Sequence, residues 1–600
     1  MKKIFFLCLA VLLLQSATAQ TTDKRLAGLD TFINRILKEW SAAGVTVAVV
    51  EKNKVILAKG FGYKDYENKV PVTENTLFAI GSCTKAFTSS LLAFPMKEGK
   101  LDLDKPVTQY LPELRFVDDE LNNNVTARDM MSHRTGLPRH DLAWYGAPTK
   151  RDSLIYIIRY FEKTAPLRRL WQYNNFMFLT QGVLAEKLSG KSWETLVKEQ
   201  LFTPLNMTSS NTSMNDHVKA ADYSFGYTEN NGKVMKMKFK NIDAIGPAGS
   251  INSNAKDMAN WVMMWVNGGK FNGKEILPAS YYNQAISSQM VTGALLPTKE
   301  IPDVFFSNYG FAWFLANYRG HYRVEHGGNI DGFSSNTSFY PTDSIGIFVS
   351  VNQNGSPIPG IIRNTIIDRL LGLKYRDWQR TQKNAVDKAK AAAKEKLKAD
   401  STQRKLGTRP THTITEYTGT FTNEGYGTLK IDLQKDSLIG KYNGLNFKIK
   451  HYHFNYFNFI PYDEELGTAE EDDAMKGQFN INLKGEIESL SLPLQPGVKD
   501  IVFTKKVETI DVSKADLEKY VGEYELPGPT LVKVYIKGEN TLIAFVTGQT
   551  DYELVPVKPD LFNLKIAAGY SVRFEKNDAG EIIALSFLQP NGTFKATRKK

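Results

Sequence analysis

The chain has 600 residues, of which 42% are hydrophobic and 23% charged, and its formal net charge is +11. These fractions are those of an ordinary globular protein, and the length predicts two to four domains. Much of the positive excess lies in residues 374–405, which we interpret as a solvated basic helix or linker, so no nucleic-acid partner is expected.

The N-terminus has the layout of a cleavable secretory signal. Two lysines precede an apolar run and the small-residue site Ala17-Thr18-Ala19, which predicts a signal peptide over residues 1–19. We therefore expect a periplasmic or secreted protein with no transmembrane segment in the mature chain, because no later run approaches about twenty apolar residues. Only Cys8 and Cys83 exist, and Cys8 leaves with the signal, so no intramolecular disulfide is expected.

Residues 20–373 mix short strands with helices. The stretch "VTVAVVEKNKVILAKGFGY" alternates like a hairpin, and "FMFLTQGVLAEKLSGKSWETLVKEQLF" predicts two helices broken at Gly190. Strands near both ends of this region surround a helix-rich middle. This order favours an α/β or α+β domain, with an antiparallel sheet backed by helices.

The character changes after residue 410, where alternation with turn residues replaces helical periodicity. Two halves of this region resemble each other, with "ITEYTGTF" and "GEIESLSL" in the first and "LEKYVGEY" and "GEIIALSF" in the second. We interpret them as two small β-barrel-like domains, residues 411–505 and 506–600. The basic segment 374–410 would be a helical linker between separately cored units.

The stretch "AIGSCTKAFTSS" places Ser82 three residues before Lys85, so that both side chains share a helix face. Serine needs an adjacent base to act as a nucleophile, and a lysine in an apolar helix can be that base. The alternative is a lysine that extends to solvent from the helix flank. A second Ser-x-x-Lys match, Ser253 with Lys256, has a simpler explanation as a helix N-cap.

Several further blocks appear in a fixed order. "WQYNNFMFLTQGVL" contains Tyr173 and Asn175, and "VEHGGNIDGFSSNTSFYP" contains His326-Gly327-Gly328. With "GSCTK", these blocks resemble the Ser-x-x-Lys, Tyr-x-Asn and third elements of the penicillin-recognising serine hydrolases, in their class C β-lactamase, D-aminopeptidase and esterase branch. The resemblance covers residues 30 to 370.

The resemblance implies acyl transfer from an acyl-enzyme on Ser82, with Lys85 and Tyr173 sharing the proton transfers. It also implies that Asn175 binds Lys85 and the substrate amide. The backbone amides of Ser82 and Asn329 would form the oxyanion hole. Gly327 and Gly328 would let a substrate lie against the strand, and no cofactor or metal is implied.

The third element departs from the Lys-Thr-Gly that is usual among the family's drug-hydrolysing members. His326 stands in the lysine position and is expected to be mostly neutral near pH 7, gaining charge towards pH 6. We therefore expect an amide or ester hydrolase of a small-molecule or short-peptide substrate, similar to D-aminopeptidases or esterases. A β-lactamase or penicillin-binding protein stays open, as does an envelope-binding protein with a vestigial hydrolase domain.

Other catalytic patterns are missing from the sequence or incomplete. The chain has no G-x-S-x-G elbow and no His-Glu-x-x-His motif. His451 and His453 share a strand face but have no identifiable third ligand, so no metal site is predicted. The oligomeric state and the role of the β domains stay open.

Overall fold

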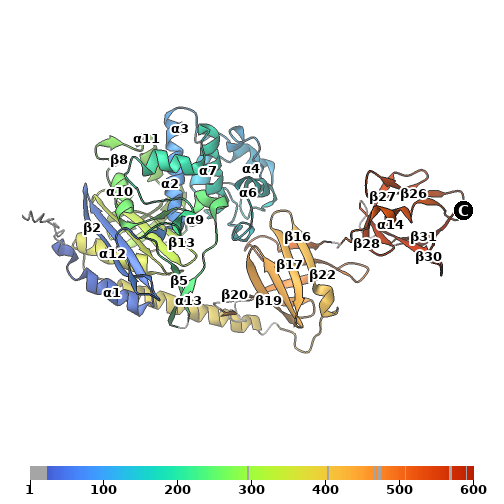
Figure 1. The fold of residues 1–600 in the computed structure, drawn as a ribbon. Coiled ribbons are helices and arrows are strands. Elements are labelled where there is room, and N and C mark those ends of the chain that lie inside the picture. The colour runs from blue at the N-terminus through green and yellow to red at the C-terminus, as the bar shows by residue number, and fades with distance from the viewer. Residues whose placement is uncertain are drawn as a thin grey trace, which may run out of the picture.

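The computed structural model describes residues 23–599 except 231, 294–295, 300, 402–403, 464–466, 469–473, 507–508, 566–569 and 590. The predicted signal peptide, residues 1–19, lies outside the described residues. Figure 1 shows a large N-terminal domain followed by two barrels. No helix in the described part of the chain is long and apolar enough to cross a membrane.

The N-terminal domain is built on a nine-stranded sheet in which every neighbouring pair is antiparallel. This confirms the predicted antiparallel sheet. In spatial order the strands are β10 (Met290–Val291), β11 (Val304–Tyr309), β12 (Phe314–Tyr318), β13 (His321–Ile330), β14 (Phe333–Tyr340), β15 (Ile345–Val351), β1 (Gly44–Glu51), β2 (Lys54–Asp65) and β3 (Val70–Pro71).

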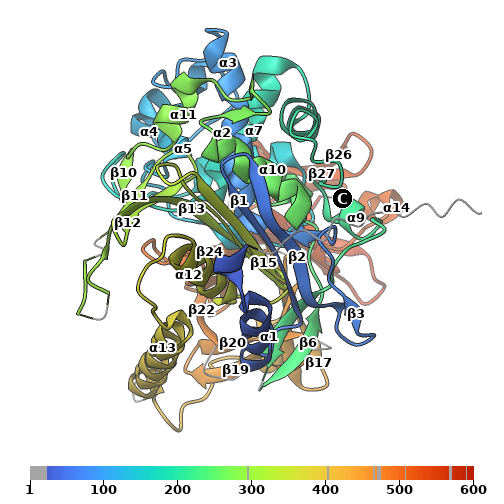
Figure 2. The same cartoon turned by 90° about the vertical axis from the view of Figure 1, so that its left-hand side faces the viewer.

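Helices cover both faces of this sheet, which explains why central strand β1 is buried almost throughout. Its alternate residues Val45, Val47 and Val49 pack with helices α1 (Leu29–Glu39) and α12 (Ile358–Leu370). Ala48 and Val50 face the other cluster, which includes α2 (Thr84–Leu91), α7 (Asn175–Ser189) and α10 (Ala255–Val266). Figure 2 shows the sheet between these two groups.

Smaller elements complete the domain. The break predicted in the middle region is confirmed, because α7 ends at Gly190, which has a left-handed φ of +74°. The remaining helices of the domain are α3 (Ala93–Lys97), α4 (Asp119–Asn124), α5 (Ala127–Met131), α6 (Arg151–Ile157), α8 (Trp193–Leu196), α9 (Met214–His217) and α11 (Ala279–Ala285), and the remaining strands are β4 (Phe78–Ala79), β5 (Gly226–Asn230), β6 (Lys233–Met237), β7 (Asn252–Ser253), β8 (Lys270–Phe271) and β9 (Lys274–Glu275).

The C-terminal region forms two closed eight-stranded antiparallel barrels, which confirms the two predicted all-β units. Barrel 1 contains β16 (Gly419–Asn423), β17 (Gly427–Gln434), β18 (Ser437–Tyr442), β19 (Leu445–His453), β20 (Tyr456–Asp463), β22 (Met475–Ile481), β23 (Ile487–Leu492) and β24 (Ile501–Lys505), with β21 (Gly467–Thr468) added beside β20. Barrel 2 contains β25 (Gly522–Glu525), β26 (Leu531–Lys537), β27 (Thr541–Val546), β28 (Asp551–Lys558), β29 (Leu561–Leu564), β30 (Ser571–Lys576), β31 (Ile582–Gln589) and β32 (Gly592–Arg598), after helix α14 (Lys514–Glu518).

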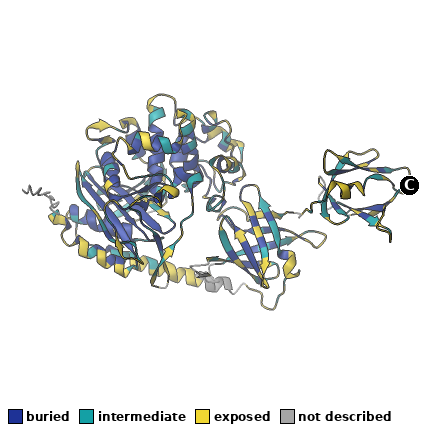
Figure 3. Ribbon diagram, viewed as in Figure 1, coloured by how far each residue is buried: buried dark blue, intermediate teal, exposed yellow. Residues whose placement is uncertain are grey.

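The two barrels differ in how they join the rest of the chain. The basic segment forms helix α13 (Trp378–Ser401), whose described side chains are mostly exposed (Figure 3). The apolar core of barrel 1 is continuous with that of the N-terminal domain, whereas the core of barrel 2 is a separate cluster. The expectation of separately cored units is therefore wrong for barrel 1, because side chains of both bodies pack into one cluster.

Candidate active site

Ser82 lies in a short 3₁₀ turn, Gly81–Cys83, that leads directly into helix α2. Gly81 has a left-handed φ of +51°, and a Cβ built on it would lie 2.9 Å from the amide nitrogen of Asn329 in β13. Glycine is required there because both the backbone conformation and the close strand exclude a side chain. The turn thus brings the Ser82 segment against the strand that carries the third sequence element.

Lys85 lies one helical turn after Ser82, and its side chain is fully buried at 0% exposure. Its Nζ atom is 3.1 Å from Ser82 Oγ. The same nitrogen is 2.7 Å from Asn175 Oδ1 and 2.7 Å from the carbonyl oxygen of Ala248. The structure therefore brings together three residues that the sequence predicted for the site.

The environment of Lys85 favours its neutral form. Burial, followed by the positive charge of Arg139, lowers the pKa of Lys85 well below its usual range. A neutral amine has two N–H donors and one lone pair. Since Asn175 Oδ1 and the Ala248 carbonyl can only accept, they take both N–H groups, and the lone pair is left for the Ser82 hydroxyl. This geometry can remove the proton from Ser82.

Tyr173 also contacts the Ser82 oxygen. Its hydroxyl donates to Ser82 Oγ at 2.6 Å, and its ring lies under the Arg139 guanidinium at 4.5 Å. Burial raises the pKa of Tyr173, although the Ser82 hydrogen bond and Arg139 act in the opposite direction. The phenol therefore stays protonated in the resting site and can donate a proton.

His133, which sequence reasoning missed, holds the backbone on both sides of Tyr173. Its carbonyl oxygen accepts from the Gln172 amide at 2.8 Å, and its Nδ1 accepts from the Asn174 amide at 3.1 Å. The His133 ring packs 4.4 Å from the Tyr173 ring, centroid to centroid. A left-handed φ of +56° allows His133 to make both contacts.

The structure corrects the expectation for His326. His326 is 2% exposed, with Nε2 bonded to the Tyr309 hydroxyl at 2.9 Å and Nδ1 near the Gly327 carbonyl. Burial, followed by the charge of Lys85, lowers the pKa of His326 to about 3. His326 therefore stays neutral at pH 6 and supplies no charge to a substrate, because its burial disfavours the protonated ring.

The two glycines after His326 have different surroundings. A Cβ on Gly328 would lie 2.0 Å from the Ile80 carbonyl, whereas one on Gly327 would have only the Ser335 carbonyl at 3.6 Å. Gly328 thus lets β13 approach the turn before Ser82, while Gly327 stands at a more open position. Asn329 follows in β13 and lines the same cleft as Ser82.

Arg139 and Asp141 also belong to the site, although no sequence pattern indicated them. Asp141 Oδ2 accepts from Arg139 Nε at 2.5 Å, and its Oδ1 accepts from Asn175 Nδ2 and Trp144 Nε1, each at 2.8 Å. Asp141 thereby orients Asn175, whose carbonyl oxygen faces Lys85. Arg139 lies in a loop, and Asp141 begins the short 3₁₀ turn Asp141–Ala143, so no periodicity could single them out.

These groups surround a cleft of about 380 Å³. Asp331, at one wall, accepts hydrogen bonds from the Tyr145 hydroxyl and from the Lys240 amide. The polar lining comes from Ser82, Arg139, Asp141, Tyr145, Asn175, Asn329, Asp331 and Asn354, and the apolar lining from Leu142, Trp144, Met237, Ile242, Ile245 and Ile330.

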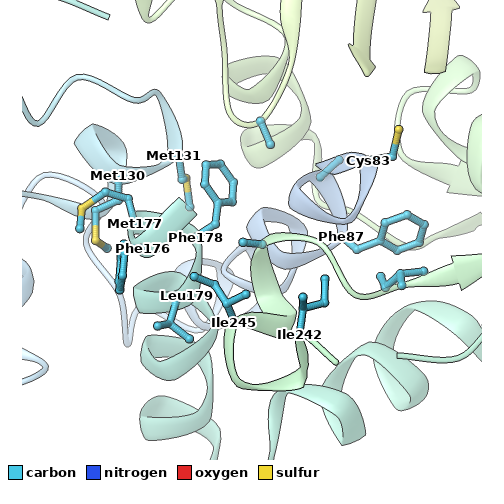
Figure 4. Close-up of a cluster of buried hydrophobic side chains, with 14 of the residues drawn as sticks. Cys83, Phe87, Met130, Met131, Phe176, Met177, Phe178, Leu179, Ile242 and Ile245 are labelled. Carbon is cyan, nitrogen blue, oxygen red and sulfur yellow. The ribbon is translucent and has the colours of Figure 1, made fainter. Parts of the chain in front are cut away.

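A tightly packed apolar cluster lies around the reactive groups. Figure 4 shows Phe178 and Ile245 within it. Phe178 is fully buried, and Lys85 Nζ lies 5.3 Å from the centre of its ring. This apolar surface keeps water from the amine, which is the desolvation that lowers the pKa of Lys85.

The helix-backed antiparallel sheet is the fold of serine β-lactamase-like hydrolase domains. The family described as "Beta-lactamase" matches residues 29–371, and the "Domain of unknown function (DUF3471)" matches residues 403–505, which include barrel 1. The chain therefore belongs to the β-lactamase family of serine hydrolases and carries a C-terminal DUF3471 region.

Comparisons with individual proteins agree with this family. The chain is 29% identical over 425 residues to Unguisins hydrolase ungD' of Aspergillus campestris (strain IBT 28561), covering 66% of this chain and 76% of the relative. It is 24% identical over 341 residues to Protein flp of Staphylococcus aureus (strain MRSA252), covering 56% and 64% of the two chains. The octameric penicillin-binding protein homologue from Pyrococcus abyssi has a similar fold, with a TM-score of 0.51, 20% identity, and coverage of 80% of this chain and 100% of that one.

Proposed function

We propose that the protein is a serine hydrolase that cleaves amide or ester bonds through an acyl-enzyme on Ser82. The observation that carries this proposal is the position of Ser82 Oγ, 3.1 Å from Lys85 Nζ and 2.6 Å from the Tyr173 hydroxyl. A nucleophile within hydrogen-bond distance of both a neutral amine and a phenol has both a base and an acid.

The proposed reaction follows from these contacts. The Lys85 amine takes the proton of the Ser82 hydroxyl as Oγ bonds to the substrate carbonyl carbon, and the carbonyl electrons move to its oxygen. The N–H groups of Ser82 and Asn329 would stabilise that oxyanion. When the tetrahedral intermediate collapses, the leaving nitrogen or oxygen takes a proton from Tyr173, which Lys85 then reprotonates. Water releases the acyl group by the same steps in reverse.

For the substrate, we propose a small molecule or short peptide, including D-amino-acid peptides, as in D-aminopeptidase-like enzymes and esterases. The support is the histidine in the third element, together with a relative that is named a hydrolase. His326 is buried and neutral, so it does not supply the cation that the lysine of Lys-Thr-Gly offers a substrate carboxylate. We further propose a periplasmic or secreted location, on the basis of residues 1–19.

The test is a substrate screen of the purified protein with D- and L-aminoacyl amides, short esters and a chromogenic cephalosporin. A fluorophosphonate probe should label wild-type protein at Ser82, and Ser82→Ala should abolish both labelling and hydrolysis without changing Tm. Ser253→Ala is the matched control, since Ser253 also belongs to a Ser-x-x-Lys match and is buried. Full hydrolysis by Ser82→Ala would rule out the mechanism, and rapid turnover of the cephalosporin alone would favour a β-lactamase.

A further inference from the structure

Barrel 1 contacts the segment that forms one wall of the cleft, on the side away from the cleft. We call residues 139–147 the wall segment, because Arg139 and Asp141 face the cleft from it. Between them, His140 turns the opposite way, is 1% exposed and has a left-handed φ of +49°. Its amide donates to Gln495 Oε1 of barrel 1 at 2.6 Å.

The His140 ring makes a second contact with barrel 1. Its Nε2 is 3.1 Å from the Glu162 carbonyl, which can only accept, so Nε2 carries the ring proton. Burial lowers the pKa of His140 to about 4, and the neutral ring leaves Nδ1 as an acceptor. The Tyr426 hydroxyl of barrel 1 lies 2.7 Å from that nitrogen and donates to it. Barrel 1 thus binds both the backbone and the ring of His140.

The turn between β18 and β19 contacts the wall segment at two more points. The Leu142 carbonyl accepts from the Tyr442 hydroxyl at 2.8 Å and from Asn443 Nδ2 at 2.9 Å, while Leu142 itself lines the cleft. At Gly146 the two bodies are so close that an added Cβ would lie 2.2 Å from the Asn443 carbonyl. Only glycine fits this contact.

A continuous path of contacts connects this interface to the reactive amine. His140 lies between Arg139 and Asp141 in the chain, so its position determines theirs. Asp141 then accepts from Asn175 Nδ2 at 2.8 Å, and Asn175 Oδ1 accepts from Lys85 Nζ at 2.7 Å. A displacement of the wall segment would therefore change both the substrate side of the cleft and the hydrogen bonding of Lys85.

We propose that barrel 1 is a positioning element of the active site, which holds the wall segment in the geometry that orients Asn175 and shapes the cleft. The inference rests on the hydrolase function proposed above. The residues that act in this way are Gln495, Tyr426, Tyr442 and Asn443, none of which touches the reacting atoms. Barrel 2, which has its own core cluster, does not share this role.

Two glycine substitutions in the full chain form a matched pair. Gly146→Ala and Gly190→Ala impose the same backbone strain, since their φ angles are +70° and +74°, but Gly190 has no atom within 4 Å of an added Cβ. Gly146→Ala should lower kcat/KM by about tenfold or more relative to Gly190→Ala, because small displacements of active-site groups cause large losses of rate. Hydrogen exchange of residues 139–147 should also be faster in Gly146→Ala.

Two tyrosine substitutions test the interface if Gly146→Ala fails to fold. Tyr442→Phe removes only the hydroxyl that binds the Leu142 carbonyl and the Tyr426 carbonyl, and Tyr535→Phe, on barrel 2, removes a hydroxyl bonded to Asp551. We expect kcat/KM to fall for Tyr442→Phe and not for Tyr535→Phe, with faster exchange of the wall segment in the former.

The outcomes separate the two proposals. Equal kcat/KM and equal exchange in each matched pair would overturn the positioning role, and so would a loss of Tm in Tyr442→Phe with kcat/KM unchanged. A wild-type protein that hydrolyses nothing and is not labelled at Ser82 would instead remove the proposed function. The exchange rates of the wall segment would still show whether barrel 1 holds it.

Discussion

Replacing Tyr173 with phenylalanine tests the proposed proton transfers most directly. The change removes one hydroxyl, which donates to Ser82 Oγ at 2.6 Å, and leaves the ring contacts with His133 and Arg139 in place. The loss of one hydrogen bond changes the free energy of unfolding by about 1 kcal/mol. The loss of a general acid lowers kcat by about 10²- to 10⁴-fold, or about 3 to 5 kcal/mol in the activation barrier. Tyr173→Phe should therefore lose most of its activity with only a small loss of stability.

The assay is kcat and kcat/KM on the best ester or amide of the screen, beside Tm by calorimetry. Tyr309→Phe is the control, because Tyr309 also packs beside His133 and its hydroxyl is bonded to His326 rather than to Ser82. In the double variant with Lys85→Ala the two losses should not multiply, since both groups act on one oxygen. A Tyr173→Phe enzyme whose kcat is within about threefold of wild type would refute the reasoning, because the loss of a general acid should lower kcat far more.

Three further predictions follow from burial and contacts. The folded pKa of His326, about 3, lies below its ordinary value of 6.5, so the unfolded chain binds a proton that the folded chain does not. The stability that His326 contributes above pH 6.5 should fall by about 1.4 kcal/mol per pH unit below it, and His326→Gln should remove this share of the loss in urea unfolding at pH 7.5 and 5.0. His133→Asn keeps an acceptor for the Asn174 amide and tolerates a left-handed φ, so it should retain more kcat than His133→Leu at similar Tm. Equal kcat values would contradict the role of His133 in holding the backbone beside Tyr173. Removal of residues 506–600 should leave Tm and kcat/KM of the remaining protein unchanged. Removal of all residues after 373 should cause aggregation, because it exposes Leu142 and Phe161. A fully active, monomeric protein that ends at residue 373 would contradict the second expectation.

The sequence by itself determined the domain order, the antiparallel sheet, the two barrels and the Ser82–Lys85 pair. These features depend on local periodicity, because alternation marks strands and a three-residue spacing places two side chains on one helix face. Tyr173 and Asn175 were also found, through a resemblance of ordered blocks. The structure then placed both Tyr173 and Lys85 within hydrogen-bond distance of the Ser82 hydroxyl.

The burial of His326 and the identity of the cleft wall were decided by the tertiary structure alone. A histidine beside two glycines gives no sequence signal of whether it is buried or exposed. Here it is 2% exposed and bonded to Tyr309, which belongs to another strand. Arg139 lies in a loop and Asp141 begins a short 3₁₀ turn, so neither has a sequence periodicity. A segment some 300 residues further along the chain supports this part of the chain through Tyr442. Contacts between segments so distant in sequence leave no local pattern, so only the packing of barrel 1 against the N-terminal domain could reveal them.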